Sequence, residues 1–229
     1  MNNIKTFENF NNQDIFEYIY ENDIKSVENY INSGHDLNIK NEYGHTALIY
    51  AVDNDKLEIV KLLLNAGADT NKQNNKYDTA LIYAAFYNRI KAIKLLLNYN
   101  ADINIKNYNG YTALIYAALN NGIEAIKLLL NAGADIDNQN KSGDTALIYA
   151  AFKNNKEIME LLLDYGADEF ILNDENKSFY DYLNDENKQY FTQNYPTSVY
   201  NAISHWYKKS FTEFVKDYNI KIIKYINYE

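Results

Sequence analysis

Histidine and cysteine supply most metal ligands and many nucleophile and base pairs in proteins. The chain of 229 residues contains no cysteine and only three histidines, His35, His45 and His205. No glycine-rich phosphate loop or catalytic motif accompanies them. We therefore expect no catalytic residue, no cofactor and no metal, and we interpret each histidine as structural or simply exposed.

Neighbouring carboxylates are the second candidate for chemistry, since two such groups can divide the work of a general acid and a general base. Asp53 with Asp55 and Asp174 with Glu175 are such pairs. An acidic chain produces such pairs freely, and this one carries a formal net charge of -9. The pairs therefore favour a charged surface over an acid and base pair of the glycosidase type.

The charge and hydropathy of the chain indicate which kinds of partner the protein is suited to bind. An excess of acidic residues, 31 against 22 basic ones, disfavours nucleic acid, because neutralising phosphates requires lysine and arginine. No apolar stretch approaches the roughly 18 residues that span a membrane, and the first residues do not read as a signal peptide. We expect no nucleic acid and no membrane, and a cytoplasmic protein that acts in its own cell or in a host's.

A repeat organises most of the chain. The hexapeptide Thr-Ala-Leu-Ile-Tyr-Ala begins at Thr46, Thr79, Thr112 and Thr145, and the interval from one copy to the next is always the same. A run of three leucines and an exit that reads Gly-Ala-Asp or Asn-Ala-Asp follow in the same register. Repeats of about 33 residues indicate an array of supersecondary units that are stable only when stacked on one another.

The residues of one repeat predict a pair of helices. Thr46 is a good N-cap for a first short helix, and Asp55 stands at a turn where Asp and Asn tolerate the left-handed backbone conformation. Ile59 and Leu63 lie at helical spacing in a second helix, which Gly67 ends. The polar segment that follows is typical of a hairpin-like connection.

These features resemble the ankyrin repeat, whose unit of about 33 residues carries a Thr-Pro-Leu-His-x-Ala helix start, a Leu-Leu pair and a Gly-Ala-Asp exit. The resemblance covers about four fifths of the chain, although Ala and Ile replace the proline and histidine of the family motif in every copy. It implies an all-α fold, an ankyrin-repeat solenoid of stacked helix pairs with hairpin-like loops, plus a short C-terminal helical extension. We expect an array over 12–195, with an N-cap of about 12–40, full repeats at 41–73, 74–106, 107–139 and 140–172, and a C-cap of about 173–195.

Repeat two departs from the pattern at two positions. Tyr77 replaces the glycine of the hairpin tip, and Asn100 replaces the glycine of the helix exit. A tyrosine at positive φ would be strained by about 1 kcal/mol or more. We therefore expect an altered loop around Tyr77.

The last residues form a separate segment. Pro196 is the only proline and marks a boundary, after which residues 197–229 carry five lysines against three acidic residues. We expect 196–229 to form a helical extension, and we interpret it foremost as a cover for the last repeat. An enzymatic alternative would need a pocket beside this tail, using His205 or the Asp181 and Asp185 carboxylates.

Recurring residues build such a scaffold, and residues that vary at exposed positions are free to meet a partner. The recurring Tyr50, Tyr83, Tyr116 and Tyr149 are therefore interpreted as packing between repeats. In ankyrin-like architecture the hairpin tips and the exposed side of the first helix form a concave surface. This resemblance singles out the following as partner-binding residues: Tyr43, His45, Asp53, Lys76, Asp78, Phe86, Tyr87, Tyr108, Asn109, Tyr111, Leu119, Lys141, Asp144, Phe152 and Lys153.

The sequence thus supports a non-enzymatic protein-protein interaction scaffold. Its aromatic concave face, rimmed by Asp53, Asp78 and Asp144, would bind a protein with a basic or mixed surface. Two alternatives remain open: residues 197–229 could act as a second interaction module, or the protein could be an inhibitor or immunity-type protein that covers a basic partner.

Overall fold

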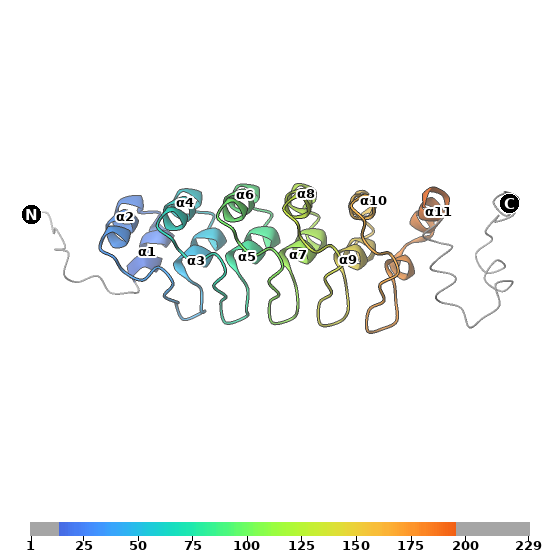
Figure 1. The fold of residues 1–229 in the computed structure, drawn as a ribbon, viewed down its shortest axis with the longest axis horizontal. Coiled ribbons are helices and arrows are strands. Elements are labelled where there is room, and N and C mark those ends of the chain that lie inside the picture. The colour runs from blue at the N-terminus through green and yellow to red at the C-terminus, as the bar shows by residue number, and fades with distance from the viewer. Residues whose placement is uncertain (1–13, 196–229) are drawn as a thin grey trace, which may run out of the picture.

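The structure is a computed structural model, and it describes residues 14–195. Helices follow one another in pairs along an extended array (Figure 1). The pairs are α1 (Asp14–Glu21) with α2 (Ile24–Asn32), α3 (Ala47–Asp53) with α4 (Leu57–Asn65), α5 (Ala80–Phe86) with α6 (Ile90–Asn98), α7 (Ala113–Leu119) with α8 (Ile123–Asn131), and α9 (Ala146–Phe152) with α10 (Lys156–Asp164). The short 3-10 helix η1 (Phe179–Tyr182) and α11 (Asp185–Asn194) complete the described chain.

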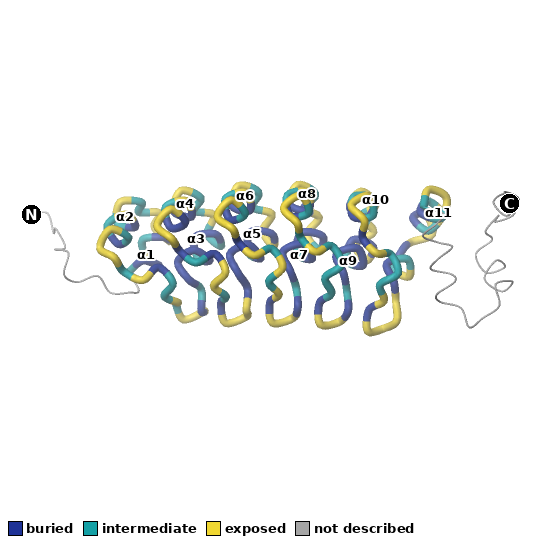
Figure 2. Tube along the Cα trace, in the orientation of Figure 1, coloured by how far each residue is buried: buried dark blue, intermediate teal, exposed yellow. Residues whose placement is uncertain are grey.

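The helices form two rows. The first helices α1, α3, α5, α7 and α9 make one row, the second helices and α11 make the other, and hairpin loops project from the first row (Figure 1). Burial is concentrated where the two rows face each other, while the hairpin tips and the outer side of the second row are exposed (Figure 2). The described residues thus form an all-α solenoid, as predicted.

Local chemistry begins and ends the first helices as the sequence predicts. The side chain of Thr46 accepts a hydrogen bond from the backbone N–H of Ile49 at 3.3 Å, and Thr79, Thr112 and Thr145 cap their helices in the same way. Asp55 takes a φ of +57° just beyond Asn54, the C-cap of α3, and its equivalents Asn88, Asn121 and Asn154 are also left-handed. This turn brings each second helix back across the first.

The core consists of small residues in the first row and branched residues in the second. Ala47 and Ala51 are fully buried in α3, and their equivalents in α5, α7 and α9 are buried too. Ile59 and Leu63 of α4 are also fully buried. Small side chains let neighbouring first helices approach closely, so that each pair buries its apolar side against the next pair.

The ends of the described array differ from its middle. At the N-terminal end Ile15 and Ile19 are buried, whereas Glu17, Glu21, Lys25 and Glu28 are exposed, which is the polar outer face that a terminal repeat needs. At the other end the rings of Phe179 and Phe191 pack edge to face with centroids 5.9 Å apart. The predicted helical extension, 196–229, lies outside the described residues.

The prediction of an altered loop at Tyr77 is wrong. Tyr77 takes a φ of +63°, in the same left-handed region as the glycines at the equivalent tips. The N–H of Tyr77 donates to the carbonyl of Asn74 at 3.0 Å, as the N–H of Gly110 does to the carbonyl of Asn107 at 2.9 Å. The loop keeps its conformation because its other hydrogen bonds hold it, and Tyr77 is therefore held at a positive φ that is strained for a residue with a Cβ.

Replacing Tyr77 with glycine should therefore stabilise the array. Glycine adopts positive φ without the Cβ clash that a tyrosine meets there, so we expect the free energy of unfolding to rise by about 1 kcal/mol. The control is Tyr77→Ala, which removes the ring but keeps a Cβ at positive φ and should give no such gain. Urea denaturation measures both, and equal effects of the two variants would contradict the strain.

Candidate interaction face

A recurring asparagine organises every hairpin. The side-chain carbonyl of Asn107 accepts from the backbone N–H groups of Asn109 at 3.0 Å and Tyr111 at 2.9 Å. The same two bonds form around each of the other asparagines in this register, Asn41, Asn74, Asn140 and Asn173. One amide therefore satisfies two backbone donors that the hairpin would otherwise leave unpaired.

The amide groups of these asparagines also join successive repeats. Asn107 donates to the Asp78 carboxylate of the preceding hairpin at 2.8 Å, and Asn173 donates to the Asp144 carboxylate at 2.7 Å. Sequence reasoning missed these asparagines, although their recurrence at the same position of every repeat was the signal that identifies them. Backbone bonds between hairpins, such as Lys141 N–H to Asn109 carbonyl at 2.9 Å, hold the same register.

The recurring tyrosines lie at the base of the hairpins. The hydroxyl of Tyr149 accepts from Asn140 at 3.0 Å and also bonds to the hydroxyl of Tyr111, in the preceding repeat, at 2.5 Å. Likewise the hydroxyl of Tyr83 bonds to the His45 ring at 3.0 Å. These contacts support the interpretation that the tyrosines pack between repeats, and they use hairpin residues as partners.

Asp53, His45 and Tyr83 form the arrangement that most resembles a catalytic one. His45 Nε2 bonds to the hydroxyl of Tyr83, and His45 Nδ1 lies 4.0 Å from the Asp53 carboxylate. Burial raises the pKa of Tyr83 to about 12, with further contributions from Asp78 and Asp53, so its hydroxyl keeps its proton near neutral pH. A hydroxyl held in this state is a poor nucleophile.

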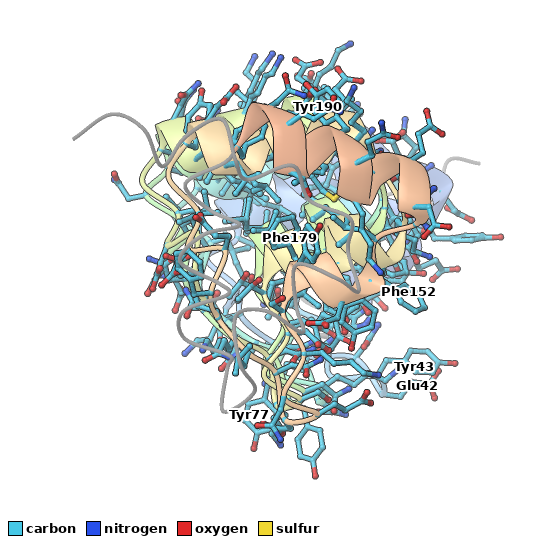
Figure 3. The ribbon with its side chains drawn as sticks, turned by 90° about the vertical axis from the view of Figure 1, so that its right-hand side faces the viewer. Glu42, Tyr43, Tyr77, Phe152, Phe179 and Tyr190 are labelled. Carbon is cyan, nitrogen blue, oxygen red and sulfur yellow. The ribbon has the colours of Figure 1, made fainter. Side chains whose placement is uncertain are left out.

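The structure divides the predicted partner-binding residues by their exposure. Nine are exposed: Tyr43, Lys76, Phe86, Tyr87, Tyr108, Asn109, Lys141, Phe152 and Lys153. Five are half-buried: His45, Asp53, Tyr111, Leu119 and Asp144. Figure 3 shows Tyr43 and Phe152 on the same side of the array, although they lie in different repeats, while Tyr77 lies at the hairpin tips.

Asp78 is the exception, because its residue surface is only 8% exposed. The prediction that Asp78 rims an exposed face is therefore wrong. Desolvation by burial raises the pKa of its carboxyl, against the hydrogen bonds from Asn107 and Asn74 that favour the charged form. Asp144 is half-buried and also bonded to the next hairpin, so both aspartates stabilise contacts between repeats.

One line of exposed and half-buried side chains crosses the array at the last turn of the first helices. We name this line the helix-end column, and its members are Tyr20, Asp53, Phe86, Leu119 and Phe152. Tyr20 is 68% exposed, Phe86 42% and Phe152 60%. Large apolar side chains thus stay in solvent at equivalent positions of α1, α5 and α9.

Comparison with known protein families agrees with this geometry. The family model described as "Ankyrin repeats (3 copies)" matches residues 15–107 and 104–173, which is more than half of the chain. The chain belongs to the ankyrin-repeat family. Ankyrin repeats generally mediate protein-protein interactions and are typically non-enzymatic. No curated protein matched the sequence.

Between residues 14 and 195 no helix has the length and apolar character needed to cross a membrane. The same residues hold no group of three or more histidine, cysteine, aspartate or glutamate side chains arranged to bind a metal ion.

Asn107→Ala should be strongly destabilising. The change leaves two backbone N–H groups without their acceptor and removes one of the hydrogen bonds to the buried Asp78 carboxylate, which we expect to lower the free energy of unfolding by about 2 to 4 kcal/mol. Chemical denaturation measures this loss. The exposed Asn109 is the matched control, and Asn109→Ala should stay within about 0.5 kcal/mol of the parent. Similar losses for both would show that the hairpin amide has no special part.

His45 should make stability depend on pH in a defined window. Burial lowers the pKa of His45, with Lys76 acting in the same direction and Asp53 and Asp78 acting against it. The unfolded histidine therefore binds its proton first, so stability present above about pH 6.5 is lost as the pH falls towards the folded pKa. Equilibrium unfolding between pH 7.5 and 5.5 measures the slope. His45→Gln should flatten that slope, and an unchanged slope would contradict the assignment.

Proposed function

We propose that the array is a non-enzymatic interaction scaffold that binds a partner protein across the helix-end column and the hairpin sides next to it. The observation that carries this proposal is the exposure of Phe86 and Phe152 at equivalent positions of α5 and α9. Exposing large apolar side chains in register costs free energy unless a partner covers them. Aromatic residues, phenylalanine among them, are also enriched in the cores of known protein interfaces.

Neighbouring contacts hold these aromatic rings in place before any partner arrives. The Phe86 ring packs edge to face on Tyr116, with centroids 5.3 Å apart, and on Tyr87, with centroids 4.8 Å apart. The Phe152 ring likewise packs edge to face on Tyr182, with centroids 6.1 Å apart. Rings that are fixed in this way lose little conformational freedom when they bind, which supports their role as anchors.

Charged groups border the aromatic positions and offer a means of specificity. The Nζ atom of Lys141 lies 3.9 Å from the centroid of the Tyr108 ring, and the Nζ atom of Lys153 lies 5.9 Å from the centroid of the Phe152 ring. The rim therefore carries charges of both signs and is not uniformly acidic. Of the three carboxylates predicted at the rim, Asp78 and Asp144 are bonded to the asparagine of the next hairpin, and Asp53 is not. Such charges discriminate between partners more than they add affinity.

The two alternative functions are not favoured by any contact in residues 14–195. A second interaction module at 197–229 falls outside the described residues. An inhibitor or immunity-type role would use the same face as the leading proposal. Deleting 197–229 tests the first of these alternatives, because a folded truncated chain that still binds its partner would assign the function to the array.

Partner capture should depend on the exposed aromatic residues. We expect Phe86→Ala combined with Phe152→Ala to weaken partner binding at least about tenfold, since buried interface aromatics often contribute more than about 1.4 kcal/mol each. The partner is first isolated by affinity purification with the full chain and identified by mass spectrometry. Its dissociation constant is then measured for parent and variant.

Tyrosines of the second helix row provide the matched control. Tyr99 and Tyr165 are 38% and 45% exposed and lie at the ends of α6 and α10, in the row away from the hairpins. Replacing both by alanine should leave the dissociation constant unchanged. Equal losses of binding for the two double variants, or no loss for Phe86 and Phe152, would sink the assignment of the face.

A further inference from the structure

The helix-end column contains one member that does not fit its neighbours. Asp53 ends α3 at the position that Phe86, Leu119 and Phe152 occupy in the following repeats. Its carboxylate keeps 27% of its side-chain surface exposed. A partner that lies along the column therefore meets apolar side chains in the later repeats and a carboxylate in repeat one.

Four aromatic rings stand in an unbroken row beside this carboxylate. Ring centroids are 6.2 Å apart between Tyr43 and His45, 5.1 Å between His45 and Tyr83, and 6.1 Å between Tyr83 and Tyr87. We name these four residues the ring row. Tyr43 and Tyr87, at its two ends, are 65% and 46% exposed, so faces of the row are open to a partner.

The Asp53 carboxylate lies beside this row. It is 4.0 Å from His45 Nδ1. Near the other end of the row, burial raises the pKa of the Tyr87 hydroxyl, and the charge of Asp53 and a hydrogen bond to it raise this pKa further. The carboxylate and the rings therefore form one continuous site across the interface of repeats one and two.

No cation of the described residues neutralises the Asp53 carboxylate. Its one ion-pair contact there is His45, whose pKa is lowered by burial, so that the ring is mainly neutral at pH 7. The guanidinium of Arg89 is nearby, but it pairs with the Asp55 carboxylate at 2.8 Å and donates to the backbone carbonyl of Asp53 at 3.1 Å. His45 Nδ1 is buried and lacks a hydrogen-bond partner among residues 14–195.

We propose that Asp53 and the ring row receive a lysine or arginine side chain of the partner protein. A carboxylate supplies the opposite charge, and aromatic faces attract cations beyond that. The site is open on one side, so a free amine would bury little surface there. A side chain carried by a protein is held in addition by contacts along the helix-end column, which makes this inference rest on the proposed function.

The spacing of the column predicts a pattern in the partner. Packed helices lie about 8 to 10 Å apart, and three residues of an extended chain span about 10 Å. An extended segment that crosses the first helices therefore advances about three residues for each repeat. A basic residue at Asp53 then places apolar residues three and six positions away, at Phe86 and Leu119.

A random library of 12-residue peptides displayed on phage, selected on the immobilised full chain, tests the proposal. We expect selected peptides to share a basic residue with an apolar residue at the third position from it. In synthetic copies, replacing that lysine with norleucine, or that arginine with citrulline, should weaken binding to the parent at least about tenfold. When binding to the Asp53→Asn variant is measured, the same peptide replacement should weaken it less than about threefold, because the interaction that the replacement removes is already absent from that variant.

The control variant is Glu58→Gln, which removes the same charge from an exposed position in α4 of the same repeat. When binding to the Glu58→Gln variant is measured, the peptide replacement should still weaken it about tenfold. An equal effect against Asp53→Asn and the parent would overturn the cation site, while the scaffold proposal stands if binding still requires Phe86 and Phe152. Peptides that bind the Phe86→Ala, Phe152→Ala variant equally well, or a selection that yields no binder, would overturn both.

Discussion

Every other feature of the molecule depends on one constraint, which is that no helix pair can bury its own apolar side. The first helices carry alanines at the buried positions Ala47 and Ala51 and their equivalents, and these allow the next first helix to approach closely. The branched residues of the second helices then fill the space between the rows. Folding is consequently a property of neighbouring repeats, and the described part of the array begins with exposed charged residues in α1 and α2 and ends with packed aromatic rings in η1 and α11.

Stacking would still leave the hairpins free to shift relative to one another, and side-chain amides prevent this. The asparagine at the start of each hairpin satisfies two backbone donors of its own loop, and in two repeats it also reaches the aspartate of the preceding loop. A similar role recurs at the helix exits, where the side chain of Asn71 accepts from the backbone N–H of Asp102, in the next repeat, at 2.8 Å. Hydrogen bonds of this kind convert an apolar stack into one with a defined register.

The division between scaffold and binding face follows from this use of the recurring residues. Positions that repeat in type, such as Thr46 and Tyr83, have their polar groups bonded within the array. Positions that vary in type at the ends of the first helices, such as Asp53 and Phe86, remain open to solvent. This is why a repeat array can change its partner without changing its fold.

Much of the fold could be predicted from the sequence, because its causes are local. The threonine caps, the left-handed residues after the first helices and the glycine exits each depend on a few adjacent residues, and all of them occur where the pattern places them. The prediction for Tyr77 was wrong because local strain was weighed without the hydrogen bonds that hold the loop. The prediction for Asp78 was wrong because its burial depends on Asn107, which belongs to the hairpin of the next repeat.

By itself, therefore, the sequence determined the period, the helices and the family, since a pattern that recurs at a constant interval reports the contacts common to all repeats. Only the tertiary structure decided which carboxylates are available to a partner. Asp78 and Asp144 bond to the asparagine of the next hairpin, whereas Asp53 lies among open rings without a cation of its own in the described chain. The physical reason is that burial and pairing at any one position are set by the adjacent repeat, whose contribution becomes visible only when the repeats are stacked.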